Sequence, residues 1–207
     1  MPFGDSNPDF LSYAGGRVSA VPKTQYYTAT TIDGFIADDH NSLDWLFEVA
    51  EDETNPFTAF FAGVGAFAMG ATTYQWVLDH DDLLEHPEKW TAEYADVPAL
   101  VFTHRDLPAI PGASLRFVRG DVRPVHAAMT AAAGGKNLWV VGGGALAGAF
   151  ADAGLLDELI LGVAPVTLGA GAPLLPRRLP SSRLSLSSLE RHGEFAYLTY
   201  AVAPPAA

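Results

Sequence analysis

The stretch NLWVVGGGALAGAFAD, residues 137–152, decides how the rest of the chain is interpreted. Asn137 to Val141 is mostly apolar and rich in β-branched and aromatic residues, which is the pattern of a buried strand. The glycines Gly142 to Gly144 follow directly, and the alanine-rich segment Ala145 to Asp152 favours a helix. Gly154 fits a helix stop, and Leu159 to Val163 is a second apolar run. The stretch therefore predicts a strand–helix–strand unit.

The glycine junction has two interpretations. Glycines permit dihedrals and close backbone approaches that a Cβ would block, and this freedom serves either helix–sheet packing or a bound ligand. The unpaired N–H groups at the start of the helix favour an anion. The spacing is not the G-x-G-x-x-G dinucleotide fingerprint, since Gly148 comes too late to be its third glycine. The case for a nucleotide therefore depends on the rest of the chain.

The composition limits the classes of partner. A net charge of −12 argues against nucleic acid or an anionic membrane, since either needs a basic face, but it leaves room for a small anionic ligand. The absence of cysteine excludes disulfides and thiol catalysis and is compatible with a reducing cytoplasm. No apolar run reaches the ~18 residues of a membrane span, and the N-terminus does not resemble a signal peptide. We therefore expect a cytoplasmic protein.

The pattern along the 207 residues predicts a flexible arm over residues 1–23 and one domain over residues 24–207. Asn55 and Pro56 are typical of a helix start, and Asp121 is expected to cap a later helix. The acidic run Asp79 to Glu88 is interpreted as a surface loop, and its histidines match no metal-ligand spacing. Pro165 to Pro176 is expected to be irregular. The remaining apolar runs predict strands at Gln25 to Thr31, Val64 to Met69, Ala99 to Thr103 and Ser114 to Val118, and a C-terminal hairpin of Leu184 to Leu189 with Phe195 to Val202.

Alternating strands and helices predict an α/β domain with a mostly parallel sheet. Such sheets bind ligands outside the carboxyl ends of their strands. Three predicted strand ends carry glycine or hydroxyl residues suited to phosphate, namely Gly70 to Thr73, Thr103 to Arg105, and Gly142 to Leu146. The three ends together favour a nucleotide-sized anionic ligand.

Taken together, these features resemble the dihydrofolate reductase-like superfamily. It is most similar to the reductase domain of bacterial riboflavin biosynthesis, the deaminase-reductase C-terminal domain family, from about Tyr26 to the last strand. The motifs that carry the resemblance are Thr31 to Ala37 (TIDGFIA), Met69 to Tyr74 (MGATTY), Val101 to Arg105 (VFTHR), Val140 to Gly144 (VVGGG), and Leu155 to Leu159 (LLDEL) with Gly169 to Pro176. Their order along the chain adds specificity that no single motif has.

The resemblance implies a three-layer fold with a mostly parallel central sheet and a C-terminal antiparallel hairpin. It also implies an NADPH-dependent reductase. The backbone of Ala29 would meet substrate and nicotinamide, Ile36 would lie near the nicotinamide, and Arg105 would meet the 2′-phosphate. The cofactor-binding residues expected in this way are Ala29, Ile36, Gly70, Ala71, Thr72, Thr73, Thr103, His104, Arg105, Val141, Gly142, Gly143, Gly144, Ala145 and Leu146. Relatives also suggest a homodimer in which a two-fold partner covers the apolar hairpin.

The expected reaction is hydride transfer to a C=N or C=O bond of a small heterocycle of the pteridine or pyrimidine kind. Asp44 is the candidate proton donor, because relatives place an acidic substrate-binding residue near this helix start, and partial burial beside Trp45 would favour its protonated form. The alternative role of Asp44 is a helix cap, with Glu48 as the second candidate acid. The expected substrate-binding residues are Ala29, Thr31, Asp33, Trp45 and Glu48; Asp33 is equally typical of a turn.

Two positions depart from the family pattern. Relatives commonly carry a phosphate-binding arginine where this chain has Ala71, and riboflavin-pathway enzymes place basic residues in the first loop, where this chain has the acidic segment Asp38 to Asp44. The second departure argues against a phosphorylated sugar substrate. The first keeps open a non-catalytic nucleotide-binding or purely structural member of the fold. A true dihydrofolate reductase is the third alternative.

Overall fold

The computed structural model of the protein describes residues 21–49 and 56–205. Its strands are β1 (Thr24–Thr31), β2 (Phe35–Ala37), β3 (Val64–Gly70), β4 (Ala99–Phe102), β5 (Leu115–Val118), β6 (Asn137–Gly142), β7 (Glu158–Ala164), β8 (Ala172–Pro173), β9 (Leu184–His192) and β10 (Phe195–Val202). Its helices are α1 (Asp44–Phe47), α2 (Pro56–Phe61), α3 (Ala71–His80), α4 (Pro87–Tyr94), α5 (Val122–Ala132) and α6 (Gly144–Asp152), and a 3₁₀ turn, η1, spans Ser181–Arg183.

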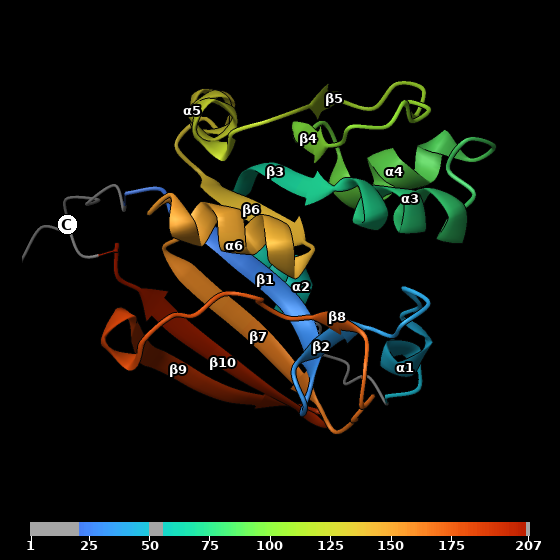
Figure 1. Cartoon of the computed structure of the whole chain (residues 1–207). Coiled ribbons are helices and arrows are strands. Elements are labelled where there is room, and N and C mark those ends of the chain that lie inside the picture. Colours follow the sequence, from blue (N-terminus) through green and yellow to red (C-terminus); the bar gives the residue numbers. More distant parts are fainter. Residues whose placement is uncertain (1–20, 50–55, 206–207) are drawn as a thin grey trace, which may run out of the picture.

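Eight strands form one sheet in the order β5-β4-β3-β6-β1-β7-β10-β9 (Figure 1). The six strands from β5 to β7 pair in parallel, whereas β10 pairs antiparallel with both β7 and β9. Strands β2 and β8 pair antiparallel in a separate two-stranded sheet. Because six strands are parallel, their carboxyl ends meet at one edge of the sheet.

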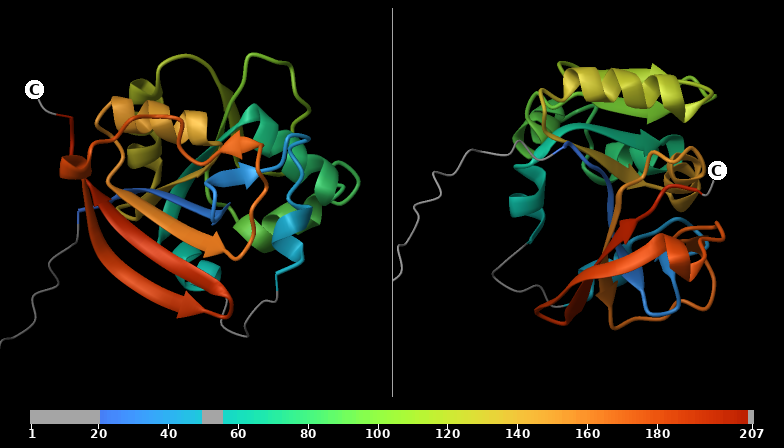
Figure 2. Two further views of the ribbon diagram at one scale, coloured as in Figure 1. Left: turned by 60° about the horizontal axis from the view of Figure 1, so that its bottom comes forward. Right: turned by 90° about the vertical axis from the view of Figure 1, so that its left-hand side faces the viewer.

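Helices cover both faces of the sheet, since successive strand residues point to opposite faces and both faces are apolar. On one face Tyr26 and Val140 pack with residues of α5 and α6. On the other face Phe67 and Trp139 pack with residues of α2, α3 and α4. Figure 2 shows α2 and α6 on opposite sides of the strands. The layers are therefore helix, sheet and helix.

The predicted fold class is confirmed, with the parallel sheet and the terminal hairpin in place. Asp121 caps α5 as predicted, because its carboxylate accepts a hydrogen bond from the Arg123 amide. Of the predicted arm, residues 1–20 lie outside the described residues, as does Asn55. Residues 21–23 are described, and Lys23 donates its backbone N–H to the side chain of Asn137.

Two predictions about loops were wrong. The segment expected to be a surface loop, Asp79 to Glu88, contains the end of α3 and the first residues of α4. Helix α4 forms there because Pro87 stands at its start and Trp90 buries its ring against Phe67. The segment Pro165 to Pro176 is not wholly irregular either, since Ala172–Pro173 pairs with β2. Within the described residues, no helix has the length and apolar character needed to cross a bilayer.

Candidate active site

Two adjoining cavities open along the carboxyl edge of the sheet. The larger has a volume of about 940 Å³ and is lined by parts of β1, β2, α1, α3, the β6–α6 junction and β10. The smaller has a volume of about 460 Å³ and lies beyond the ends of β4 and β5. Ala71 and Thr72, at the start of α3, line both cavities. The start of α3 is therefore the shared wall of one extended binding site.

Two helices begin in this site without a side-chain cap. The N-cap of α3 is Gly70 and the N-cap of α6 is Gly143, and neither position has a capping side-chain hydrogen bond. Helix α5 differs, since Asp121 satisfies its first turn. In the first turn of α6 the Leu146 amide donates to the Gly143 carbonyl oxygen at 3.0 Å. The residues that begin the two helices, Ala71 and Thr72 of α3 and Gly144 and Ala145 of α6, line the larger cavity, and the helix dipoles add partial positive charge there. This arrangement suits the phosphates of an elongated ligand.

The three glycines of the β6–α6 junction have different surroundings. A Cβ on Gly144 would stand 2.3 Å from the carbonyl oxygens of Pro173 and Leu174, so this glycine is required by close packing. A Cβ on Gly143 would meet only the Cδ1 of Ile36, at 3.7 Å, and both residues line the larger cavity. The junction therefore serves both interpretations made from the sequence, with Gly144 packed against protein and Gly143 open to a ligand.

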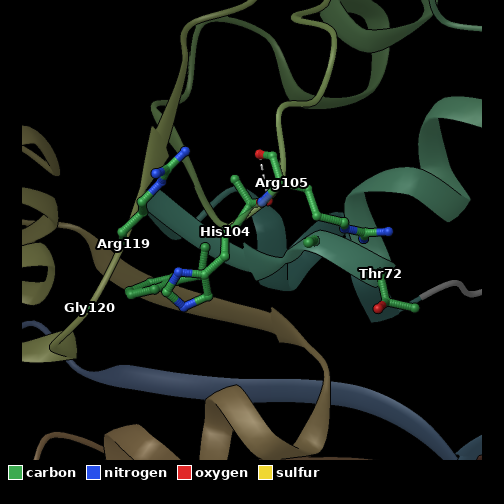
Figure 3. A pocket seen from close by; sticks show the side chains of 8 residues that line it. Thr72, His104, Arg105, Arg119 and Gly120 are labelled. Atoms are coloured by element: carbon green, nitrogen blue, oxygen red, sulfur yellow. Dashed lines mark hydrogen bonds between the residues drawn. The ribbon is translucent and has the colours of Figure 1, made fainter.

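The smaller cavity has a basic rim. Thr103, His104 and Arg105 follow β4, and Arg119 and Gly120 follow β5 (Figure 3). The Thr103 hydroxyl accepts a hydrogen bond from the Arg105 amide at 2.9 Å and donates one to the Arg105 carbonyl oxygen at 3.0 Å, which fixes the turn. The Arg105 side chain is exposed and has no ion pair with any described residue. Its guanidinium group is therefore available to a phosphate.

Arg119 is a site residue that sequence reasoning missed. It contacts Asp106 at 3.7 Å, but both side chains are largely exposed, so this ion pair is weak. Its sequence signal was the same as that of Arg105, a basic residue directly after a predicted strand. The order of the strands, which places β5 beside β4, was needed to bring the two arginines to one cavity.

The larger cavity has an aromatic wall at the end formed by β1 and β10. We use this name for the lining residues Tyr27, Phe57, Trp139, His192, Phe195 and Tyr197. Tyr27 stacks on Phe60, with ring centroids 4.4 Å apart, and its carbonyl oxygen accepts a hydrogen bond from the Trp139 indole. Burial raises the pKa of the Tyr27 hydroxyl well above its usual range, and the neighbouring Tyr197 raises it further. Tyr27 is therefore uncharged at neutral pH. The aromatic wall is suited to a flat apolar ring.

The structure brings all the expected cofactor-binding residues to these two cavities. The larger is lined by Ala29, Ile36, Gly70, Ala71, Thr72, Thr73 and the segment Val141 to Leu146, and the smaller by Ala71, Thr72, Thr103, His104 and Arg105. Of the expected substrate-binding residues, Ala29 lines the larger cavity, whereas Thr31, Asp33, Trp45 and Glu48 line neither. Asp44, the candidate proton donor, lines neither as well.

The partial burial expected for Asp44 is not found, because its side chain is exposed at the first position of α1. Its backbone amide donates to the Ser42 hydroxyl, and Leu43, not Asp44, is the N-cap residue. Trp45 is buried in a small core with Val49 and Ala164 and so supports α1 from beneath. Glu48 is exposed. This geometry gives no support to Asp44 or Glu48 as the acid of the site.

Asp33 and Thr31 hold two loops together. The Thr31 hydroxyl donates to the Asp33 carboxylate at 2.5 Å, and the backbone amides of Leu168 and Gly169 donate to the same carboxylate. Thr31 also accepts a hydrogen bond from the Phe35 amide. These contacts, with the Thr31 hydroxyl first and the Gly169 amide second, hold the pKa of Asp33 below its usual range. The carboxylate thus ties the β1–β2 turn to the segment that follows β7.

The fold is that of a dihydrofolate reductase-like α/β protein. A dihydrofolate reductase of Enterococcus faecalis, solved with NADP(H), matches with a TM-score of 0.52 over 87% of this chain and 96% of its own, at 12% identity. Residues 22–197 match the family described as the RibD C-terminal domain, and the chain belongs to this family.

Two relatives match this chain over nearly the whole of their own length. YwjB, an uncharacterized protein of Bacillus subtilis strain 168, is 30% identical over 180 residues, which are 86% of this chain and 97% of its own. A solved protein of Shewanella sp. PV-4, which carries a provisional riboflavin-biosynthesis assignment, is 26% identical with a TM-score of 0.70. That match covers 87% of this chain and 98% of the Shewanella chain. The family is riboflavin-pathway reductase-like, which supports an oxidoreductase kind of protein.

The Asp33 contacts generate a prediction about acid stability. Because the pKa of Asp33 is lower in the folded state, its stabilising contribution is present above the unfolded value, ~4, and is lost as the pH falls through the folded value. Asp33→Asn should therefore lower the melting temperature at pH 7, and the difference from wild type should shrink below pH ~4. Thermal unfolding from pH 3 to pH 7 measures both. An equal melting temperature at pH 7 would contradict the role assigned to this carboxylate.

Proposed function

We propose that this protein is a cytoplasmic NADPH-dependent reductase that transfers hydride to a C=N or C=O bond of a small pteridine-like or pyrimidine-like heterocycle. The observation that carries the proposal is the pair of uncapped helix starts between a basic cavity and an aromatic one. An NADPH molecule needs that order of surroundings, with cationic groups at the 2′-phosphate, amides at the pyrophosphate and apolar walls at the nicotinamide.

The residues present fit this cofactor. Arg105 and Arg119 would hold the 2′-phosphate, and the first turns of α3 and α6 would hold the pyrophosphate. Ile36, Gly143 and the backbone of Ala29 would enclose the nicotinamide. When bound, the reduced nicotinamide supplies a hydride, and the protein supplies orientation and a site shielded from water. Ala71 lacks the cationic side chain that the family resemblance leads us to expect there, and Arg119 would offer a replacement from the end of β5, two strands away from β3.

The first loop disfavours a phosphorylated substrate. Asp38 organises this loop, since its carboxylate accepts hydrogen bonds from the amides of His40 and Ser42 at 2.8 Å and 2.7 Å. Asn41 from the same loop lines the larger cavity. Asp39 is exposed beside it, so the loop carries negative charge where a substrate phosphate would be repelled. A heterocycle without a phosphorylated sugar therefore suits the site.

The first test is a titration of purified protein with NADPH, followed by NADPH fluorescence. Saturable binding of one cofactor per chain is expected. No binding at millimolar NADPH would contradict the proposal and leave the structural alternative. Binding without turnover of dihydrofolate or of related C=N and C=O heterocycles would favour a non-catalytic nucleotide-binding protein.

Gly143 gives a second prediction. Gly143→Val should abolish NADPH binding and preserve the fold, because its side chain would extend past the 3.7 Å contact with Ile36 into the cavity. The matched control is Ala132→Val, an exposed position on α5 that lines neither cavity. Circular dichroism checks the fold of both variants. Normal NADPH affinity in folded Gly143→Val would remove this junction from the site.

Arg105 gives a third prediction, about cofactor choice. A charge-assisted hydrogen bond is typically worth ~1.5–3 kcal/mol, so Arg105→Ala should weaken NADPH binding by roughly tenfold or more. Its affinity for NADH, which lacks the 2′-phosphate, should hardly change. Arg191→Ala is the control, since it removes the same charge from an exposed position on the terminal hairpin. Calorimetric titration with both cofactors measures the two affinities. Equal losses of affinity for NADPH and NADH would show that Arg105 does not bind the 2′-phosphate.

We also propose that the protein is a homodimer, which gives a fourth prediction. Strand β9 is an edge of the sheet, and its residues Leu186 and Leu189 are 54% and 66% exposed. An exposed edge with large apolar side chains favours pairing with a second copy. Light scattering at low micromolar concentration should return twice the chain mass of 21.9 kDa, and Leu189→Lys should reduce it. A single chain mass for the wild type would rule the dimer out.

A further inference from the structure

Strand β7 has a glycine, Gly162, where a neighbouring phenol ring crosses it. Gly162 pairs with Ala29 of β1 on one side and with Tyr197 of β10 on the other. A Cβ on Gly162 would stand 3.0 Å from the Cζ of Tyr197 and 3.3 Å from its hydroxyl oxygen. The ring of Tyr197 therefore lies over Gly162, and any larger residue at this position would displace the ring.

The crossing carries the Tyr197 hydroxyl to β1. It lies 3.4 Å from the hydroxyl of Tyr27, which donates to it. This distance is long for a bond between two hydroxyls, whose usual range is about 2.5–3.0 Å. Tyr197 and Tyr27 both line the larger cavity, and the His192 ring packs edge-on against Tyr197 with centroids 5.2 Å apart. The Tyr197 side chain therefore contacts Gly162 and the His192 ring, and its hydroxyl oxygen contacts Tyr27.

The position of this hydroxyl relative to the nicotinamide enclosure is informative. Ala29 is two residues from Tyr27 on β1, so both side chains lie on the same face of the sheet. Gly162 pairs directly with Ala29, and the Tyr197 ring lies above Gly162. Among the described lining residues, the only carboxylates are those of Asp81 and Glu93, which come from the α3–α4 side of the cavity. Several cavity-lining residues on the β1–β10 side have a hydroxyl group. Among them, Tyr197 is the residue whose side chain crosses β7 toward Ala29.

We propose that the Tyr197 hydroxyl donates a hydrogen bond to the reacting nitrogen or oxygen of the substrate and passes its proton there during reduction, with Tyr27 and Gly162 as positioning residues. This inference rests on the proposed reductase function. It assigns to Tyr197 the role that the sequence predicted for Asp44.

The chemistry balances with the cofactor already proposed. When bound, the reduced nicotinamide would supply a hydride, that is a proton with two electrons, to the substrate carbon and so be oxidised, and the π bond of the C=N or C=O group would break. The Tyr197 O–H bond breaks as its proton bonds the substrate nitrogen or oxygen. Tyr197 then recovers a proton from water, since its side chain is only half-buried. Tyr27 stays protonated because burial raises its pKa, so it remains a hydrogen-bond donor to the oxygen of Tyr197 as negative charge develops there.

Calorimetric titration with lumazine, pteridine-2,4-dione, tests the contact without requiring turnover. The full-length protein is titrated with and without saturating NADP⁺, in the wild type and in three variants. Tyr197→Phe removes the hydroxyl and keeps the ring. Gly162→Ala keeps the hydroxyl and displaces the ring. Tyr200→Phe is the control, because it removes a hydroxyl from the same strand at a residue that does not line the cavity.

Tyr197→Phe and Gly162→Ala should each weaken lumazine binding roughly three- to tenfold, the usual worth of one hydrogen bond. Tyr200→Phe should bind as the wild type does. If 7,8-dihydrofolate is reduced, kcat for Tyr197→Phe should fall ~10²–10⁴-fold, as for other positioned acids. NADPH affinity should be the same in the wild type and in all variants. If the wild type itself does not bind NADPH, this result counts against the reductase proposal and not against the role of Tyr197.

Three results would overturn the inference. One is lumazine binding by Tyr197→Phe at wild-type affinity. Another is a wild-type protein that binds NADPH but neither binds lumazine nor reduces dihydrofolate. The third is unchanged kcat in Tyr197→Phe across the pH range. Should Gly162→Ala fail to fold, the pair Tyr197→Phe and Tyr200→Phe still decides, since each changes a single hydroxyl.

Discussion

Helices α3 and α6 both begin at the carboxyl edge of the sheet with glycine at the N-cap, which provides no capping side-chain hydrogen bond to the first turn. Unsatisfied N–H groups are costly when buried, so such helix starts are stable beside water or beside an anion. The parallel order of β3 and β6 brings the two helix starts together. A Cβ on Gly70 would stand only 3.7 Å from the Gly142 carbonyl oxygen, which shows how closely the two junctions approach. The position of the site follows from this constraint.

The aromatic wall is part of the same construction. Trp139 of β6 packs edge-on against Phe57, Phe60 and Phe61 of α2, with ring centroids 5.3 to 6.0 Å apart. It also donates its indole N–H to the backbone of Tyr27. Of these residues, Phe57 and Trp139 also line the larger cavity. Rings held in this way lose little conformational entropy when a flat ligand binds, which favours a preformed site.

Much of the fold and of the cavity lining could be predicted from the sequence, because the patterns that indicate strands and strand ends are local. Apolar runs such as Val64 to Met69 predicted the strands, and the glycine or hydroxyl residues directly after them line the two cavities. Helix α4 was missed because its first turn lies in an acidic run and its anchor, Trp90, acts through a distant contact with Phe67. The exposure of Asp44 could not be predicted, since the burial of a residue at a helix start depends on what packs over it. Tyr197 and Gly162 are 35 positions apart, and only the register of β7 and β10 brings one over the other.

The most direct test of the account is a crystal structure of the protein grown with NADP⁺. The account predicts a pyrophosphate bound by the first-turn amides of α3 and α6, with the 2′-phosphate between Arg105 and Arg119. The nicotinamide ring should lie beside Ile36 and Gly143 and face the hydroxyl of Tyr197. A cofactor bound elsewhere, or cavities without cofactor at saturating NADP⁺, would contradict it.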